Sequence, residues 1–113
     1  MEVVLDNFYV DSGVGYNLRF GSIVAKLNTV IDDSELIFHK DKPFSARDRD
    51  QDSWRGGNCA FAYKGGWWFG GCGFVCLNCD QAPRTSANLW GQWTVAHGKV
   101  RLTETKMSIR IKM

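Results

Sequence analysis

The sequence contains no long apolar run, carries almost no net charge and lacks a secretion signal. No apolar stretch is long enough to cross a bilayer, so we expect no membrane span. The formal net charge of +2 is too small to predict binding to nucleic acid or to an anionic membrane. Residues 1–8 lack the basic start and apolar block of a secretion signal. Either the signal has been removed or the chain is a piece of a longer protein, and we favour the second.

Catalytic motifs are also missing. The sequence shows no paired catalytic carboxylates, no phosphate-cradling loop and no nucleophile motif. His39 and His97 lie far apart, each near a lysine, and neither belongs to a serine or cysteine nucleophile pattern. We expect surface or packing roles for both histidines, and we predict a binding protein rather than an enzyme.

The 113 residues fit one small domain of the α+β class, with an antiparallel sheet, short helices and much irregular loop. Residues 3–10 and 16–24 have the composition of strands, and the turn residues 11–15 between them predict a hairpin. Residues 26–37 fit either a short helix or a loop followed by a strand. Residues 105–113 alternate apolar and polar side chains, which predicts a strand with one buried face.

A middle region rich in glycine and aspartate separates the predicted sheet segments. Residues 41–75 carry too many glycines and aspartates for a long helix, and they predict a structured loop region. Residues 80–86 have the composition of a linker or loop. The domain then divides into a sheet part, residues 1–40 and 99–113, and a loop part, residues 41–98.

Carboxylates occupy alternate positions in the loop part, just before a pair of glycines. Asp50 and Asp52 offer hard oxygen ligands, and the backbone carbonyls of Trp54 and Gly56 follow in the turn. Calcium takes about six to eight oxygens, which mix carboxylates, backbone carbonyls and water. We therefore predict a Ca²⁺ site formed by these four residues, with Asp48 orienting the loop or a water.

A polar surface turn is the competing interpretation of this loop. Arg47, Arg49 and Arg55 lie among the acids and would balance their charge in such a turn. An EF-hand is excluded, because its central glycine and final glutamate are missing at the required spacing.

The four cysteines permit three interpretations. The first is two disulfides, Cys59–Cys72 and Cys76–Cys79, which suit an oxidising compartment. Closing the larger loop is worth about 3 kcal/mol in chain entropy. The second is a four-cysteine zinc site, although only one C-x-x-C knuckle is present. The third is a redox-active C-x-x-C pair, which normally opens a helix.

Two adjacent tryptophans, Trp67 and Trp68, lie between two pairs of glycines. Adjacent side chains of an extended chain face opposite ways. We therefore expect one of them to enter the core and the other to line a surface pocket, where its aromatic face could stack on a sugar ring.

Several motifs occur in order along the chain. They are F-S-x-x-D-x-D-x-D at residues 44–52, G-N-C-A at residues 57–60 and G-G-W-W at residues 65–68. With the closing T-K-M-S-I-R at residues 105–110, this order resembles the C-terminal half of fibrinogen-related domains. That family includes the fibrinogen globular ends, ficolins, tachylectins, and the ends of tenascins and angiopoietins. The resemblance covers roughly residues 8–110.

The resemblance implies an extracellular, calcium-binding, lectin-like recognition module. It places calcium ligands at Asp50, Asp52 and the carbonyls of Trp54 and Gly56, and a disulfide at Cys59 and Cys72. It also implies a pocket beside the calcium site that holds acetylated sugars or other acetyl groups in many members. The peptide bond entering the second cysteine of that disulfide is often cis in the family. The expected pocket residues are Tyr63, Trp67, Trp68, Gly71, Cys72 and Gly73.

Some positions depart from the family pattern. Gly73 stands where the family usually has a pocket histidine, Cys76 and Cys79 are additional, and the family's N-terminal subdomain is missing. These departures support an alternative, a structural or assembly subunit that keeps the scaffold but has lost the ligand pocket. The expected partner is a glycan or a protein ligand, and the chain is expected to belong to a larger protein or a homo-oligomer.

Overall fold

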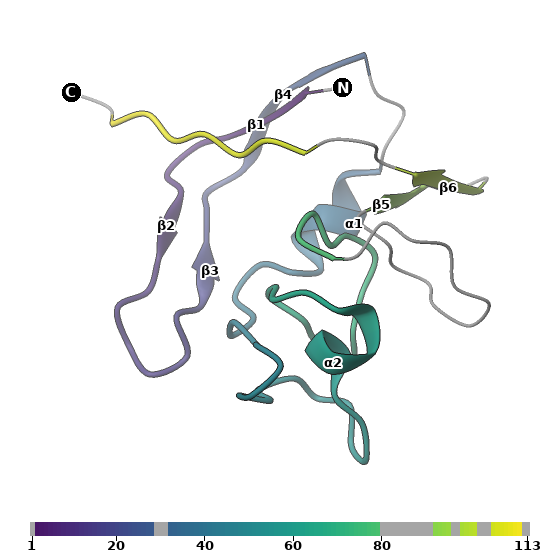
Figure 1. The fold of residues 1–113 in the computed structure, drawn as a ribbon. Helices are drawn as coiled ribbons and strands as arrows, with labels where there is room; N and C mark the ends of the chain where they lie inside the picture. The colour runs from purple at the N-terminus through teal and green to yellow at the C-terminus, as the bar shows by residue number, and fades with distance from the viewer. Residues whose placement is uncertain (1, 29–31, 80–91, 96–97, 102–104, 112–113) are drawn as a thin grey trace.

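The computed structural model describes residues 2–28, 32–79, 92–95, 98–101 and 105–111. In chain order its elements are β1 (Glu2–Leu5), β2 (Tyr9–Val10), β3 (Leu18–Arg19), β4 (Ile23–Leu27), α1 (Asp33–Ile37), α2 (Cys59–Tyr63), β5 (Gln92–Val95) and β6 (Gly98–Arg101). Within these residues the strands form two-stranded antiparallel pairs, β1 with β4, β2 with β3, and β5 with β6 (Figure 1). Small antiparallel sheets with short helices agree with the expected α+β class.

The first four strands form one long, interrupted hairpin. Both of its pairs are antiparallel, and β1 shifts register where it approaches β2. In the turn, the Asp11 carboxylate accepts the N–H of Gly13 at 3.0 Å, and the N–H of Asp11 donates to the carbonyl of Asn17 at 2.9 Å. The predicted hairpin is therefore confirmed, and its turn is closed by the aspartate and glycine chemistry that predicted it.

The segment that the sequence left ambiguous between helix and strand contains α1. Asp32 is its N-cap, and the side chain of Asp32 accepts the N–H of Ser34 at 3.0 Å. The side chain of Glu35 accepts the N–H of Asp32 at 3.4 Å, which completes a capping box. An ion pair of 2.6 Å between Lys26 and Asp33 links β4 to the helix.

Most of the core lies in the loop part, which confirms that this irregular region is structured. Phe69 and Val75 are fully buried there beside the two tryptophans, and the sheet part adds the fully buried His39 and the buried side chains of Leu18, Phe20 and Leu36. The rings of Trp67 and Trp68 meet edge-on with centroids 5.0 Å apart. Large aromatic groups therefore stabilise a region that has little regular secondary structure.

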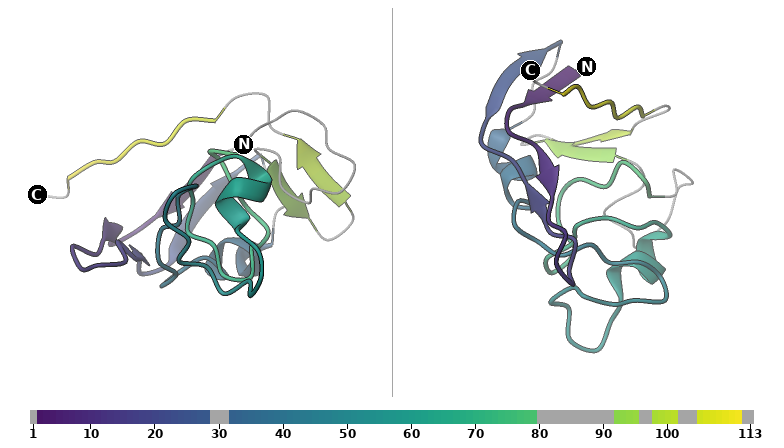
Figure 2. Two further views of the ribbon diagram at one scale, coloured as in Figure 1. Left: turned by 60° about the horizontal axis from the view of Figure 1, so that its bottom comes forward. Right: turned by 90° about the vertical axis from the view of Figure 1, so that its left-hand side faces the viewer.

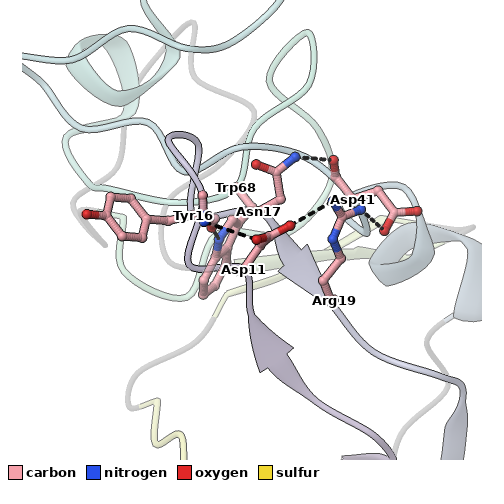
Figure 3. Close-up of polar contacts among 7 residues, drawn as sticks. Asp11, Tyr16, Asn17, Arg19, Asp41 and Trp68 are labelled. Carbon is pink, nitrogen blue, oxygen red and sulfur yellow. Dashed lines mark hydrogen bonds and ion pairs between the residues drawn. The ribbon is translucent and has the colours of Figure 1, made fainter.

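A small polar network joins the hairpin to the loop part (Figure 3). Arg19 of β3 lies between two carboxylates, with nitrogen–oxygen distances of 3.1 Å to Asp11 and 2.7 Å to Asp41. The side-chain amide of Asn17 donates to the carbonyl of Asp41 at 3.0 Å. The indole N–H of Trp68 donates to the carbonyl of Tyr16 at 2.9 Å. The hairpin turn is thereby held against the aromatic core.

The C-terminal segment differs from its prediction. Residues 105–111 are extended but form no strand, and Met107, Ile109 and Ile111 are 53, 79 and 85 % exposed. The predicted buried face is therefore wrong for these residues, because no described element covers it. Figure 2 shows the segment running away from the loop part towards the C-terminus. The loop predicted at residues 80–86 lies outside the described residues.

Candidate functional site

The aspartate loop is fixed to the segment that carries the two tryptophans. Ser45 and Trp67 exchange backbone hydrogen bonds of 2.9 and 3.1 Å. The hydroxyl of Ser45 also accepts the N–H of Gln51 at 3.0 Å, and the N–H of Ser53 donates to the carbonyl of Gly70 at 3.0 Å. Both ends of the stretch that holds the acids therefore rest on the core.

Asp52 joins the loop to α2. One of its carboxylate oxygens accepts the N–H of Trp54 at 2.9 Å, and the other accepts the N–H of Cys59 at 2.8 Å. The carboxylate of Asp50 accepts the N–H of Asp52 at 3.2 Å, so the two acids lie close together. The pKa of Asp52 is raised overall. Partial burial is the largest cause, the neighbouring Asp50 adds to the increase, and the two N–H donors oppose it. A bound cation would offset the repulsion between the two acids.

Within the described part of the chain, none of the three arginines of this loop forms an ion pair with Asp50 or Asp52. Arg47 lies over the ring of Phe61, 5.0 Å from its centroid, and Arg49 donates to the carbonyl of Val14 at 3.2 Å. Arg55 is exposed and forms no ion pair with a described residue. The competing interpretation, in which the arginines balance the acids, therefore has no support in the ion pairs of the structure.

The donor set at this loop fits a hard cation. Among the described residues, no three histidine, cysteine or acidic side chains gather to hold a metal, so backbone oxygens are needed besides Asp50 and Asp52. Gly56 has a φ of +80°, and a Cβ there would meet nothing within 4 Å. Two carboxylates, the carbonyls of Trp54 and Gly56, and water are the mixture of oxygens that calcium prefers.

All four cysteines are bonded in pairs. Cys59 and Cys72 form one disulfide and Cys76 and Cys79 form the other, each with Cα atoms 5.4 Å apart. This is the first of the three interpretations that the sequence allowed. No free thiol remains for a zinc site or a redox pair, since all four residues are described.

The turn at Cys72 differs from the family expectation. No peptide bond between described residues is cis, so the expected cis bond between Gly71 and Cys72 is absent. The chain reverses instead through a left-handed backbone at Cys72, with a φ of +67°, and the N–H of Gly70 donates to the carbonyl of Cys72 at 3.1 Å. The reversal therefore relies on a tight hydrogen-bonded turn beside the disulfide.

An open cavity of about 530 Å³ lies between the aspartate loop and this turn. It contains four of the six expected pocket residues, and Trp54 of the expected metal set also lines it. The lining residues are Ser53, Trp54, Arg55, Tyr63, Gly71, Cys72 and Gly73. The expected metal loop and the expected ligand pocket are therefore neighbours in space.

The expectation that one of the adjacent tryptophans lines the pocket is wrong. Trp67 and Trp68 are only 2 and 8 % exposed, and neither lines the cavity. Trp67 packs edge-on against the imidazole of His39 at 6.4 Å between ring centroids, and Trp68 packs against Phe44 at 5.3 Å. The rule for an extended chain fails here because core groups lie on both sides of this segment.

His39 is a packing residue, which is one of the two roles that the sequence predicted, but its hydrogen bonds were not predicted. It is fully buried, and its Nδ1 lies 2.7 Å from the carbonyl of Trp68. Its Nε2 accepts the N–H groups of Phe74 and Val75, both at 3.1 Å, so the proton is on Nδ1 and is donated to Trp68. Burial, with a smaller contribution from Lys42, lowers the pKa of His39 to about 4.

Gly73 is explained by the same histidine. Its φ is +144°, and a Cβ at residue 73 would overlap the imidazole carbon Cε1 of His39. A side chain at this position is therefore incompatible with the buried His39. No local sequence pattern separates this buried histidine from a surface one, since the neighbouring Ile37 is itself 49 % exposed.

Comparison with known proteins agrees with this fold. The sequence profile of the family described as "Fibrinogen beta and gamma chains, C-terminal globular domain" matches residues 2–112. Mouse angiopoietin-related protein 6 is 54 % identical over 63 residues, which are 56 % of this chain and 12 % of that protein. Human tenascin-R is 36 % identical over 105 residues, which are 90 % of this chain and 7 % of that protein.

A solved structure is similar as well. The fibrinogen-like globe domain of human ANGPTL6 superposes with a TM-score of 0.61 at 29 % identity. The match covers 85 % of this chain and 47 % of that one, so the chain spans about half of the solved domain.

The two disulfides and the match to a family of non-enzymatic binding modules define the class of this domain. The chain belongs to the fibrinogen C-terminal globular domain family. Domains of this family commonly bind calcium, and the homologues are secreted or extracellular proteins. Among the described residues, no helix is long and apolar enough to cross a membrane.

Proposed function

We propose that this chain is an extracellular, calcium-binding recognition module that binds an acetylated glycan or a protein ligand in the cavity beside the aspartate loop. The observation that carries the proposal is the double role of Asp52. This residue belongs to the expected metal set, and it also accepts the N–H of Cys59. Cys59 is bonded to Cys72, which lines the cavity. A metal ion that fixes Asp52 would therefore also restrict the backbone at Cys59 and, through the disulfide, the cavity wall at Cys72.

Calcium would be held by Asp50, Asp52 and the carbonyls of Trp54 and Gly56. The ion would compensate the charges of the two neighbouring carboxylates. It would also fix the backbone conformation of the exposed turn from Asp52 to Gly56. Trp54 belongs to both sets, since it lines the cavity and follows the acids. A change of the loop backbone on metal binding would therefore move an aromatic wall of the cavity.

The cavity offers donors for an acyl oxygen. In the described part of the chain, the N–H groups of Gly71, Cys72 and Gly73 form no hydrogen bond with protein atoms. Backbone N–H groups require an acceptor, which water or a ligand carbonyl supplies. The ring of Tyr63 gives an apolar surface against which a methyl group would pack.

Thermal unfolding with and without calcium tests the metal. Calcium should raise the midpoint of unfolding of the full chain, because a ligand that binds only the folded state stabilises it. The variant Asp50→Asn should lose this shift, while Glu2→Gln, at an exposed acid of β1 outside the calcium loop, should retain it. Asp50 is preferred to Asp52 for this test because Asp52 also holds backbone amides. An equal shift in Asp50→Asn and in the unmodified chain would contradict the metal assignment.

A structural or assembly subunit is the second candidate, and one observation favours it. The apolar side chains of Met107, Ile109 and Ile111 are exposed, as are those of Val24 and Leu27 on β4. Contiguous exposed apolar side chains are typical of interfaces. Sedimentation at several concentrations would reveal self-association. Saturable, calcium-dependent glycan binding by a monomer would exclude this candidate.

A further inference from the structure

We infer that the cavity beside the aspartate loop selects ligands that carry a carboxylate group, which pairs with the guanidinium of Arg55. The inference rests on the proposed function, since it uses the same cavity, and it adds the charge class of the ligand. Arg55 lines the cavity and is the one lining residue with a full charge at neutral pH.

Three other arginines of the fold have partners for their guanidinium groups, whereas Arg55 and the exposed Arg110 have none among the described residues. Arg19 lies between two aspartates, Arg47 lies on an aromatic ring, and Arg49 donates to a backbone carbonyl. Within the described residues, the guanidinium of Arg55 has no such partner. Its five N–H donors are therefore available to a ligand, and their planar fork matches the two oxygens of a carboxylate.

The remaining lining residues leave space for such a ligand. Gly71, Cys72 and Gly73 form another part of the lining, and a Cβ on Gly71 would approach only the hydroxyl of Ser53, at 3.6 Å. The unpaired N–H groups of this wall add partial positive charge. Successive backbone N–H groups near a left-handed residue such as Cys72 are a known arrangement for holding anionic oxygens.

The acids next to the cavity make the preference depend on calcium. Without a metal, the negative charges of Asp50 and Asp52 oppose the approach of an anion. A bound Ca²⁺ would neutralise these two charges and remove that repulsion. Calcium and a carboxylate ligand are therefore expected to bind cooperatively, each increasing the affinity of the other by the same factor.

Two small probes that share an acyl group but differ in charge measure the effect of a carboxylate on affinity. N-acetylglycine carries a carboxylate, whereas N-acetylglycinamide carries a neutral amide in its place. Titration of the full chain with each probe in calcium at low ionic strength, followed by NMR shifts of the cavity residues, gives both dissociation constants. We expect the acid to bind about tenfold more tightly, in line with a charge-assisted hydrogen bond. Chelation of calcium should reduce this ratio.

Variants assign the preference to one residue. Arg55→Gln should bring the ratio of the two affinities close to one, whereas Arg110→Gln, at an exposed arginine of the C-terminal segment, should keep it. Equal affinities of the two probes for the unmodified chain would overturn the inference and leave the proposed function standing. An unchanged ratio in Arg55→Gln would overturn it as well. If neither probe binds in the cavity, the inference and the proposed acetyl ligand fail together.

Discussion

The loop part and the sheet part of this chain differ in how they use their apolar residues. In the loop part, Phe69, Val75 and Trp67 are buried although few residues there are helical or extended. In the sheet part, Leu18 is buried, but β4 and the C-terminal segment expose Leu27 and Ile109 although both are extended. Regular backbone is therefore a poor guide to burial in this protein. The region that looks irregular contains most of the core, and the region that looks regular has a partly uncovered surface.

Truncation of one apolar side chain in each region should give the largest difference in stability between the two regions. Phe69→Ala should lower the free energy of unfolding by roughly 3–5 kcal/mol, because a fully buried ring is lost and a cavity remains. Ile109→Ala should change it by less than about 0.5 kcal/mol, because the side chain is already exposed. Urea unfolding measures both. Comparable losses in the two variants would show that the C-terminal segment is covered after all.

Mild acid should loosen the loop part through His39. Its pKa is about 4 in the folded protein, against an ordinary value of 6.5, so the unfolded chain takes up a proton first. The stabilisation is complete above pH 6.5 and is lost as the pH falls from 6.5 to 4. The loss approaches about 3 kcal/mol when the full difference in pKa is converted.

The interval between pH 6.5 and 5 isolates the histidine, because most carboxylates titrate lower. Unfolding free energies across this interval should fall with pH in the unmodified chain. His39→Gln should be less stable at neutral pH and should lose this slope, while His97→Gln should keep it. A slope that survives in His39→Gln would assign it to another group.

Removal of the larger disulfide should also affect the loop part. The double variant Cys59→Ser with Cys72→Ser should be less stable by about 3 kcal/mol, since the unfolded chain gains entropy when the loop opens. Calcium should then stabilise the variant less than the unmodified chain, because Asp52 binds the backbone of residue 59. Calorimetry with and without calcium measures both effects. An unchanged calcium effect would separate the metal loop from the cavity wall.

The ion pairs of Arg19, which link the two regions, should contribute least to the free energy of unfolding. Arg19→Gln removes ion pairs to Asp11 and Asp41 that are partly exposed to solvent. Such pairs contribute little to the free energy of unfolding and weaken with salt. The difference from the unmodified chain should therefore shrink in concentrated salt. A larger, salt-independent loss would mean that Arg19 positions the hairpin through packing instead.

Local chemistry made part of this fold predictable. The turn after residue 10 was readable because an aspartate and two glycines close turns by known hydrogen bonds. The capping box of α1 was also present, as Asp32 three residues before Glu35, although the segment was left open between helix and strand. The position of the aspartate loop beside the second disulfide cysteine followed from the family motif, and the cavity is lined by residues from both.

The errors arose where distant segments decide the outcome. Alternation in residues 105–113 indicates a strand only when a surface covers one face, and none of the described elements does so for Met107 or Ile109. Trp67 and Trp68 both enter the core because His39 and Phe44 approach from different parts of the chain. No local pattern contains that information.

A side-chain hydrogen bond attaches the C-terminal segment to the turn that contains Leu77. The hydroxyl of Thr105 donates to the carbonyl of Leu77 at 3.1 Å, within the turn closed by Cys76 and Cys79. The segment is therefore fastened to a covalently closed turn and not to the tryptophan core, so removal of the Thr105 hydroxyl should release the segment while the core stays packed.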